Sequence, residues 1–249
     1  MGTRFEVVLP GEAPEQFRAA GEAALEEIDA CHRRFTRFEA GGLVAHLHRN
    51  AAEVPLDATT WGLFQDALAV WTASGGAFDL TLPARRMDAI VLDPHRRTVR
   101  LALPTLPLDF GAIAKGHALD QAAGILRDAG ITSAFLHGGT SSAIGIGAPV
   151  GESGWPVALG PGPGAPVARL HDTALSVSAA WEGNPHPTIH PGTGVPVAAP
   201  RRVAVVGPSA RLADAWSTAL LILGRCPPAL GPEWTTWILD ATVPTRPAS

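Results

Sequence analysis

Residues 109–120, DFGAIAKGHALD, contain Lys115, the single lysine of the chain. Gly111 and Gly116 allow tight turns on either side of it. A helix starting near His117 would direct its unpaired N–H groups and the positive end of its dipole back at this loop. The stretch therefore predicts a phosphate or pyrophosphate site, although its spacing matches neither GxxxxGK[ST] nor GxGxxG. Chance survival of one lysine in an arginine-rich chain is the alternative explanation.

The hydrophobic spacing predicts the secondary structure around this loop. Apolar residues at helical intervals predict helices over residues 15–34, 59–73, 117–128 and 209–224. Alternating or continuous apolar runs predict strands over residues 3–9, 87–93, 98–103, 131–139, 173–181 and 201–207. Residues 35–50 are expected to be irregular, and the Gly- and Pro-rich residues 147–167 to form a long connection. Helices and strands are mixed without a regular βαβ repeat, which favours an α+β fold.

The composition argues against several kinds of partner. A net charge of -4, the absence of tyrosine and the lack of a basic run argue against nucleic-acid binding. No stretch reaches the roughly 20 apolar residues needed to cross a bilayer. Cys31 and Cys226 lie far apart without metal-binding spacing, so they are expected to pack as small hydrophobic residues. Because the first residues lack the apolar segment of an export signal, we expect a cytoplasmic protein.

The last predicted helix, with Ser209 as its N-cap and Gly224 as its stop, carries a possible cation site. Asp214 and Thr218 are four residues apart and therefore share one face of this helix. A carboxylate and a hydroxyl could offer two hard oxygens to Mg²⁺, which usually completes its shell with waters and substrate phosphates. The alternative is a solvated carboxylate beside a threonine hydroxyl bonded to its own helix backbone.

Two histidines in the segment HPTIHPGTG are candidates for proton transfer. His186 and His190 have the spacing of a zinc-binding helix, but Pro187 and Pro191 make a helix implausible there. As loop residues, both remain candidate general bases, because imidazole titrates near neutral pH. Solvent-facing histidines without a role are the alternative.

Six segments, taken in order, resemble the motifs of the ApbE family of flavin transferases. The segment that resembles the metal helix of the family is ADAWSTALLILG, and the segment that resembles its DLGxIAKG helix start is the stretch quoted above. The other four are MGTRFEV, SGGAFDLT, FLHGGT and IHPGTGVPV. The resemblance covers nearly the whole chain and implies a single ApbE-like domain over residues 1–249, with largely antiparallel sheets and packed helices.

The resemblance also implies an activity. Members of the family bind FAD with a divalent metal, usually Mg²⁺, and transfer its FMN moiety to a threonine hydroxyl of an acceptor flavoprotein, releasing AMP. The implied metal ligands are Asp214, Thr218 and the backbone carbonyl of Ala114. The implied FAD-binding positions, of which Ala77 to Asp79 match the adenine and ribose side, are Met1, Phe38, Ala77, Phe78, Asp79, Gly111, Lys115, His117 and Thr193. Because the family tolerates an acidic residue at the position of Lys115, its charge is expected to contribute only modestly to FAD binding.

The sequence departs from the family pattern at the expected general base. The family places a histidine three residues before the Asp of its DPxTG loop, whereas here His190 stands at the Asp position and Pro187 three residues earlier. Either His186 or His190 is therefore the candidate base. Thr140 replaces the Asp of the GGD motif, and Ala179 replaces the Gly of the TSG motif. The alternatives to FMN transfer are hydrolysis of FAD to FMN and AMP, or flavin binding without catalysis.

Overall fold

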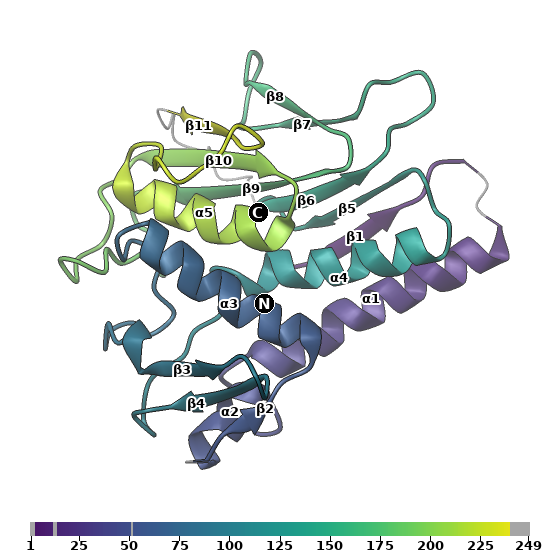
Figure 1. Cartoon of the computed structure of the whole chain (residues 1–249). Helices are drawn as coiled ribbons and strands as arrows, with labels where there is room; N and C mark the ends of the chain where they lie inside the picture. Colours follow the sequence, from purple (N-terminus) through teal and green to yellow (C-terminus); the bar gives the residue numbers. More distant parts are fainter. Residues whose placement is uncertain (1–2, 12–13, 51, 240–249) are drawn as a thin grey trace.

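The computed structural model describes residues 3–11, 14–50 and 52–239, and is built around a six-stranded sheet (Figure 1). The strand order is β1-β5-β6-β9-β10-β11, and each of these neighbouring pairs is antiparallel. The strands are β1 (Phe5–Val8), β5 (Ala134–Gly138), β6 (Ser142–Ile146), β9 (Thr173–Ala180), β10 (Arg201–Gly207) and β11 (Thr235–Leu239). The expected α+β fold with antiparallel sheets is confirmed.

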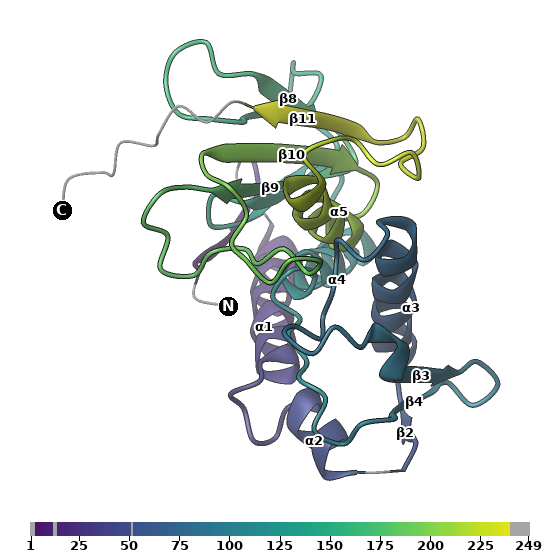
Figure 2. The same ribbon diagram turned by 90° about the vertical axis from the view of Figure 1, so that its left-hand side faces the viewer.

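Two helices, α4 (Ala114–Asp128) and α5 (Ala210–Leu223), pack on one face of this sheet. A further layer consists of α1 (Glu15–Phe35), which packs on α4, and α3 (Ala58–Ala73), which packs on α5. Figure 2 shows this layering from the side. The hairpin of β7 (Trp155–Ala158) and β8 (Val167–Leu170) packs against β6 and β9 and forms a second, smaller hydrophobic cluster.

A smaller unit lies beyond α1 and α3, at the bottom of Figure 1. It contains a three-stranded sheet of order β2-β4-β3, formed by β2 (Val54–Pro55), β3 (Ile90–Asp93) and β4 (Thr98–Leu101). The helix α2 (Leu43–Arg49) packs against β4, and a 3₁₀ turn, Met87–Ala89, leads into β3. In the described part of the chain, none of the helices is both long and apolar enough to cross a membrane.

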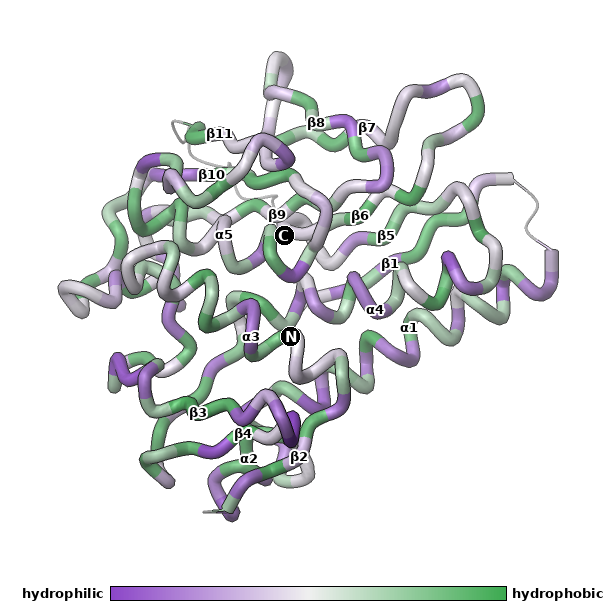
Figure 3. Tube along the Cα trace, in the orientation of Figure 1, coloured by the Kyte–Doolittle hydropathy of each residue, from purple (hydrophilic) through white to green (hydrophobic). Residues whose placement is uncertain are grey.

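The burial pattern explains how the layers form. Buried residues recur along α1 at helical spacing, and hydrophobic and hydrophilic residues accordingly alternate along this helix in Figure 3. In β9 the side chains alternate between the two faces of the sheet. Ala174 and Ala180 belong to the main core beneath the helices, whereas Leu175 belongs to the cluster under the hairpin. This alternation turns Ser176 and Ser178 toward α5, where both make hydrogen bonds.

Most of the predicted elements are confirmed, but β2, β6, β8 and β11 were not predicted, and several other predictions need correction. The helix predicted from residue 117 begins at Ala114, because the carbonyl of Phe110 already accepts the N–H groups of Ile113 and Ala114. The segment predicted to be irregular contains α2, which buries Leu43, Val44 and Leu47 on one face. The long connection over residues 147–167 contains β7. Both cysteines are free, as expected, but only Cys31 is buried, and burial raises the pKa of its thiol to about 12.

Candidate functional site

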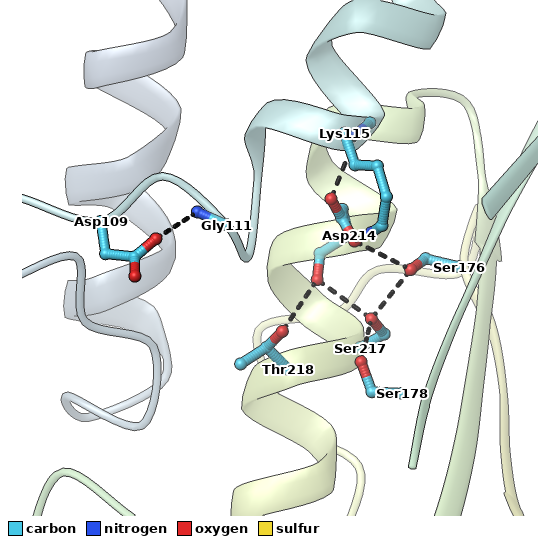
Figure 4. Close-up of polar contacts among 9 residues, drawn as sticks. Asp109, Gly111, Lys115, Ser176, Ser178, Asp214, Ser217 and Thr218 are labelled. Atoms are coloured by element: carbon cyan, nitrogen blue, oxygen red, sulfur yellow. Dashed lines mark hydrogen bonds and ion pairs between the residues drawn. The ribbon is translucent and has the colours of Figure 1, made fainter. Parts of the chain in front are cut away.

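The centre of the candidate site is the carboxylate of Asp214 on α5, which is only 3 % exposed (Figure 4). One of its oxygens, Oδ1, accepts hydrogen bonds from Lys115 Nζ at 2.7 Å and from Ser176 Oγ at 3.2 Å. The other oxygen, Oδ2, accepts the backbone N–H of Gly116 at 3.1 Å. The solvated carboxylate considered from the sequence is therefore wrong, because Asp214 is buried and bound by three donors from two other elements.

The first turn of α5 is held by α4. The Asp120 carboxylate accepts hydrogen bonds from Ser209 Oγ at 2.8 Å and from the backbone N–H groups of Ala210 at 2.8 Å and Arg211 at 3.0 Å. Burial raises the pKa of Asp120, and these hydrogen bonds oppose that rise because they favour the charged form. Together with the N-cap hydrogen bond from Leu212 N–H to Ser209 Oγ, they fix where α5 starts and hence where Asp214 lies.

The close approach of the two helices requires a glycine in α4. A Cβ atom added to Gly116 would overlap the backbone of Ala210 and would lie 2.7 Å from the nitrogen of Arg211. With no side chain at this position, the N–H of Gly116 can reach Asp214. Gly116 was predicted to permit a tight turn, but in the structure it serves helix packing.

A chain of hydroxyl groups, none of them on a predicted site residue, lies behind Asp214. Ser217 Oγ is 3.0 Å from Ser176 Oγ and 2.8 Å from Ser178 Oγ, and it also donates to the backbone carbonyl of Asp214 at 3.0 Å. Thr218 Oγ1 donates to the same carbonyl at 3.3 Å, as the alternative for this threonine predicted. The signal in the sequence was the pair of serines two residues apart in a predicted strand, since such residues share one face.

Three cavities border this centre. The central cavity, of about 450 Å³, is lined by several of the predicted residues, namely Ala77, Asp79, Gly111, Lys115, His186, Asp214 and Thr218. A second cavity, of about 350 Å³, shares Asp109, Gly111 and Lys115 with it and adds Phe38 and Ala114. A third, of about 310 Å³, shares Ala77, Asp79 and Pro191 and adds Trp71 and His190. Because the central cavity shares lining residues with each of the other two, the three cavities are neighbours, and together we call them the groove, with Lys115 and Asp214 in its central cavity.

Three of the predicted residues do not line these cavities, and a fourth lies outside the described residues. Phe78 is fully buried in the core, and its N–H donates to Ser74 Oγ at 3.1 Å. The side chain of His117 is buried among the helices, and Thr193 is exposed on the loop after His190. Met1 is the position that the structure does not describe.

The two candidate histidines occupy different places. His186 lines the central cavity with Asp214 and Thr218. His190 lines the third cavity, and its Nδ1 accepts the backbone N–H of Gly192 at 2.9 Å. An aspartate at this position could close the loop in the same way, since Asp side chains commonly accept the N–H two residues ahead. The geometry thus gives His190 a role in shaping the loop.

At the opposite end of the groove, Phe38 is exposed over 83 % of its surface. The guanidinium of Arg37 lies 4.9 Å from the centre of its ring and forms a hydrogen-bonded ion pair with Asp109 at 3.4 Å. An aromatic ring left this open beside a cavity offers a face for stacking with a planar ligand.

His117 makes stability depend on pH. Burial, with a smaller contribution from the positive charge of Arg211, lowers its pKa from 6.5 to about 4. Between these pH values the unfolded chain binds a proton that the folded protein does not, so stability falls as the pH drops through this window. We expect a loss on the order of 3 kcal/mol from this residue. Denaturant unfolding should be measured near pH 6.5 and near pH 4. Between them, the free energy of unfolding should fall less in His117→Leu than in the wild type. Equal falls would contradict the assignment of this pH dependence to His117.

The described residues contain no cluster of three or more His, Cys, Asp or Glu side chains that could hold a metal ion. A cation in the central cavity would instead rely on the Asp214 carboxylate together with neutral oxygens such as the Thr218 hydroxyl. This donor set of hard oxygens fits Mg²⁺, which needs few protein ligands when a substrate supplies phosphates. It does not fit a zinc site, which prefers nitrogen and sulfur ligands.

Comparison with solved structures shows the same fold in three bacterial proteins. A flavin transferase ApbE from Vibrio cholerae is 19% identical with a TM-score of 0.74, over 90% of this chain and 84% of the other. The ApbE protein of Thermotoga maritima is 22% identical with a TM-score of 0.74, over 89% and 83% of the two chains. The apo flavinyl transferase ApbE of Pseudomonas stutzeri is 21% identical with a TM-score of 0.71, over 89% and 84%.

A comparison with curated proteins gives no match. The sequence profile described as the ApbE family matches residues 1–86 and 82–229, which together include every segment of the groove. The match therefore extends over most of the chain, and the chain belongs to the ApbE family, a family of flavin transferases.

Proposed function

We propose that this protein transfers FMN from FAD to a threonine hydroxyl of an acceptor flavoprotein and releases AMP, with the help of a divalent cation such as Mg²⁺. Membership of the ApbE family supports this proposal. The observation that carries it is the central cavity, which Asp214, Thr218 and His186 all line. A cation ligand and a candidate base thus border the same space.

The row of three neighbouring cavities suits FAD, which has two planar ends joined by a pyrophosphate. The pyrophosphate would lie in the central cavity beside Lys115, whose ammonium attracts phosphate oxygens. Phe38 at one end and Trp71 at the other offer aromatic surface near the planar groups. Ala77 and Asp79, which match the adenine and ribose side in the family, lie where the central and third cavities meet.

The residues that would hold Mg²⁺ are Asp214, Thr218 and the carbonyl of Ala114. Ala114 is the first residue of α4, one position before Lys115, and lines the cavity next to the central one. When bound, Mg²⁺ supplies positive charge that neutralises the phosphates and stabilises the charge that develops as the anhydride breaks. Thr218 would turn its hydroxyl away from the carbonyl of Asp214 to join such a site.

The proposed reaction is an in-line displacement at phosphorus. The threonine oxygen of the acceptor forms a bond to the FMN phosphorus, the anhydride bond to the AMP phosphate breaks, and its electron pair leaves with AMP. The proton of the attacking hydroxyl goes to the imidazole of His186. The ammonium of Lys115 would hold the phosphates in position.

The base assignment can be tested by comparing two variants. Removing a general base commonly costs a factor of about 10²–10⁴ in rate, so we expect a loss of this size in kcat for His186→Ala. His190→Asn should lose much less, because an amide oxygen can still accept the N–H of Gly192. Single-turnover flavin transfer by both variants gives the comparison. A larger loss in His190→Asn would assign the base to His190 instead.

The proposed function is tested with FAD, Mg²⁺ and an acceptor protein that carries the threonine target motif of the family. The expected result is covalent flavin on the acceptor, seen as fluorescence in a denaturing gel, with one AMP released for each flavin attached. Release of AMP at the same rate without acceptor would support hydrolysis of FAD instead. A protein that binds FAD but forms neither product would be a flavin-binding protein, and the transferase proposal would be wrong.

A further inference from the structure

The carboxylate proposed to bind the metal already has a cationic partner in the protein itself. Lys115 Nζ lies 2.7 Å from Asp214 Oδ1, and the side chains of the two residues are 18% and 4% exposed. A buried carboxylate without a partner would be strongly unfavourable. Ser176 and Gly116 contribute hydrogen bonds to Asp214 but no charge. Lys115 is therefore the group that offsets the charge of Asp214 in this structure.

We propose that the ammonium of Lys115 takes the place of the metal ion in the metal-free protein. It pairs with the Asp214 carboxylate there, and a divalent cation must displace it to bind. This inference rests on the proposed function, because it requires the metal site at Asp214. Lys115 and Ser176 use both lone pairs of Oδ1, so a cation that binds this oxygen must take the place of the ammonium. Two positive ions at one carboxylate repel each other, so they compete for it.

The nature and place of the side chain fit such an exchange. Lysine carries a compact charge on a flexible stem, whereas the planar guanidinium of arginine is held in a fixed fork. Lys115 lines both the central cavity and the one beside it, so its ammonium has space to move into when it leaves Asp214. This requirement gives a physical reason for a lysine at this position in a chain whose other basic side chains are all Arg or His.

The charges balance before and after the exchange. Without ligands, the charges of Lys115 and Asp214 cancel. With both ligands bound, the divalent cation offsets the two negative charges of a pyrophosphate, and Lys115 still offsets Asp214. The freed ammonium can then approach the phosphates. Loss of Lys115 should therefore have effects of opposite sign: tighter metal binding without FAD, and weaker FAD binding when metal is present.

The test is a Mn²⁺ titration of Lys115→Met and the wild type without FAD, with free Mn²⁺ measured by its EPR signal. Methionine keeps a long flexible side chain and removes only the charge. We expect Lys115→Met to bind Mn²⁺ about tenfold more tightly, or more, because the metal no longer displaces a partner. The control Arg169→Met breaks the exposed ion pair with Glu152 and should leave the Mn²⁺ affinity unchanged. Equal or weaker binding by Lys115→Met would overturn the inference.

A second measurement separates this inference from the proposed function. In EDTA, the Lys115→Met variant should unfold at a lower temperature than the wild type. The double variant that combines Lys115→Met with Asp214→Asn should recover much of this loss in unfolding temperature. If this recovery is absent, the ion pair does not balance Asp214 and the inference is wrong even if flavin is transferred. If neither protein binds Mn²⁺, the metal site itself is wrong and the inference falls with it. A Lys115→Met protein that stays unfolded when Mn²⁺ is added would also overturn it.

Discussion

Asp214→Asn is expected to lower the rate of flavin transfer about a thousandfold, which corresponds to about 4 kcal/mol of lost transition-state stabilisation. The amide has the shape of the carboxylate but lacks its charge, so it cannot hold a divalent cation beside the phosphates. It also leaves the ammonium of Lys115 without its partner. Both effects act on the charge in the centre of the groove, where the reaction is proposed to occur.

The fold should tolerate this substitution. With its oxygen toward Gly116, the amide can still accept that N–H, and its NH₂ group can donate to Ser176 Oγ, which is also a hydrogen-bond acceptor. The helix α5 remains capped by Ser209 and Asp120. The measurement is flavin transfer at saturating FAD with Mg²⁺ varied, together with circular dichroism to confirm the fold. Asp88→Asn, which removes an exposed carboxylate paired with Arg86, is the matched control and should keep full activity. An Asp214→Asn protein with near-normal activity would show that the metal, or the reaction, lies elsewhere.

The elements predicted best from the sequence are those with local signals at both ends. The helix α5 begins and ends as expected, because Ser209 caps its first turn and Gly224 adopts the left-handed conformation, with φ at 65°. The elements missed are those defined by their surroundings. In β6, Gly145 interrupts the apolar run, and a Cβ there would lie 2.6 Å from the carbonyl oxygen of Leu170. The packing of the hairpin against β6, and not a local preference, explains this glycine.

The same distinction holds for the candidate site. One turn of helix links Asp214 to Thr218, so the sequence could pair them. The contacts of Asp214 with Lys115 and Ser176 join three separate elements, and no spacing rule predicts them. The resemblance to the family predicted that residues of α4 and α5 belong to one site, but it predicted only a modest role for Lys115 in FAD binding. Its ion pair with Asp214 became visible only once the two helices were packed.

The largest expected effect on stability comes from Gly116→Ala. The new methyl group would overlap the backbone of Ala210, and rotation about a side-chain bond cannot relieve a clash that involves Cβ itself. The helices α4 and α5 would have to separate, which weakens the hydrogen bonds from the start of α5 to Asp120 and from Gly116 to Asp214. We expect a loss of about 3 kcal/mol or more in the free energy of unfolding, and a fall in Tm of about 10 °C.

The control for this prediction lies in the same helix. Gly124 also belongs to α4, but a Cβ there would have no atom within 4 Å. Because glycine in a helix interior is less favourable than alanine by up to about 1 kcal/mol, Gly124→Ala should stabilise the protein. Urea unfolding of both variants compares one chemical change at two positions of one helix. A similar effect at both positions would mean that helix propensity governs α4, whereas opposite signs would show that Gly116 lets α5 pack closely against α4.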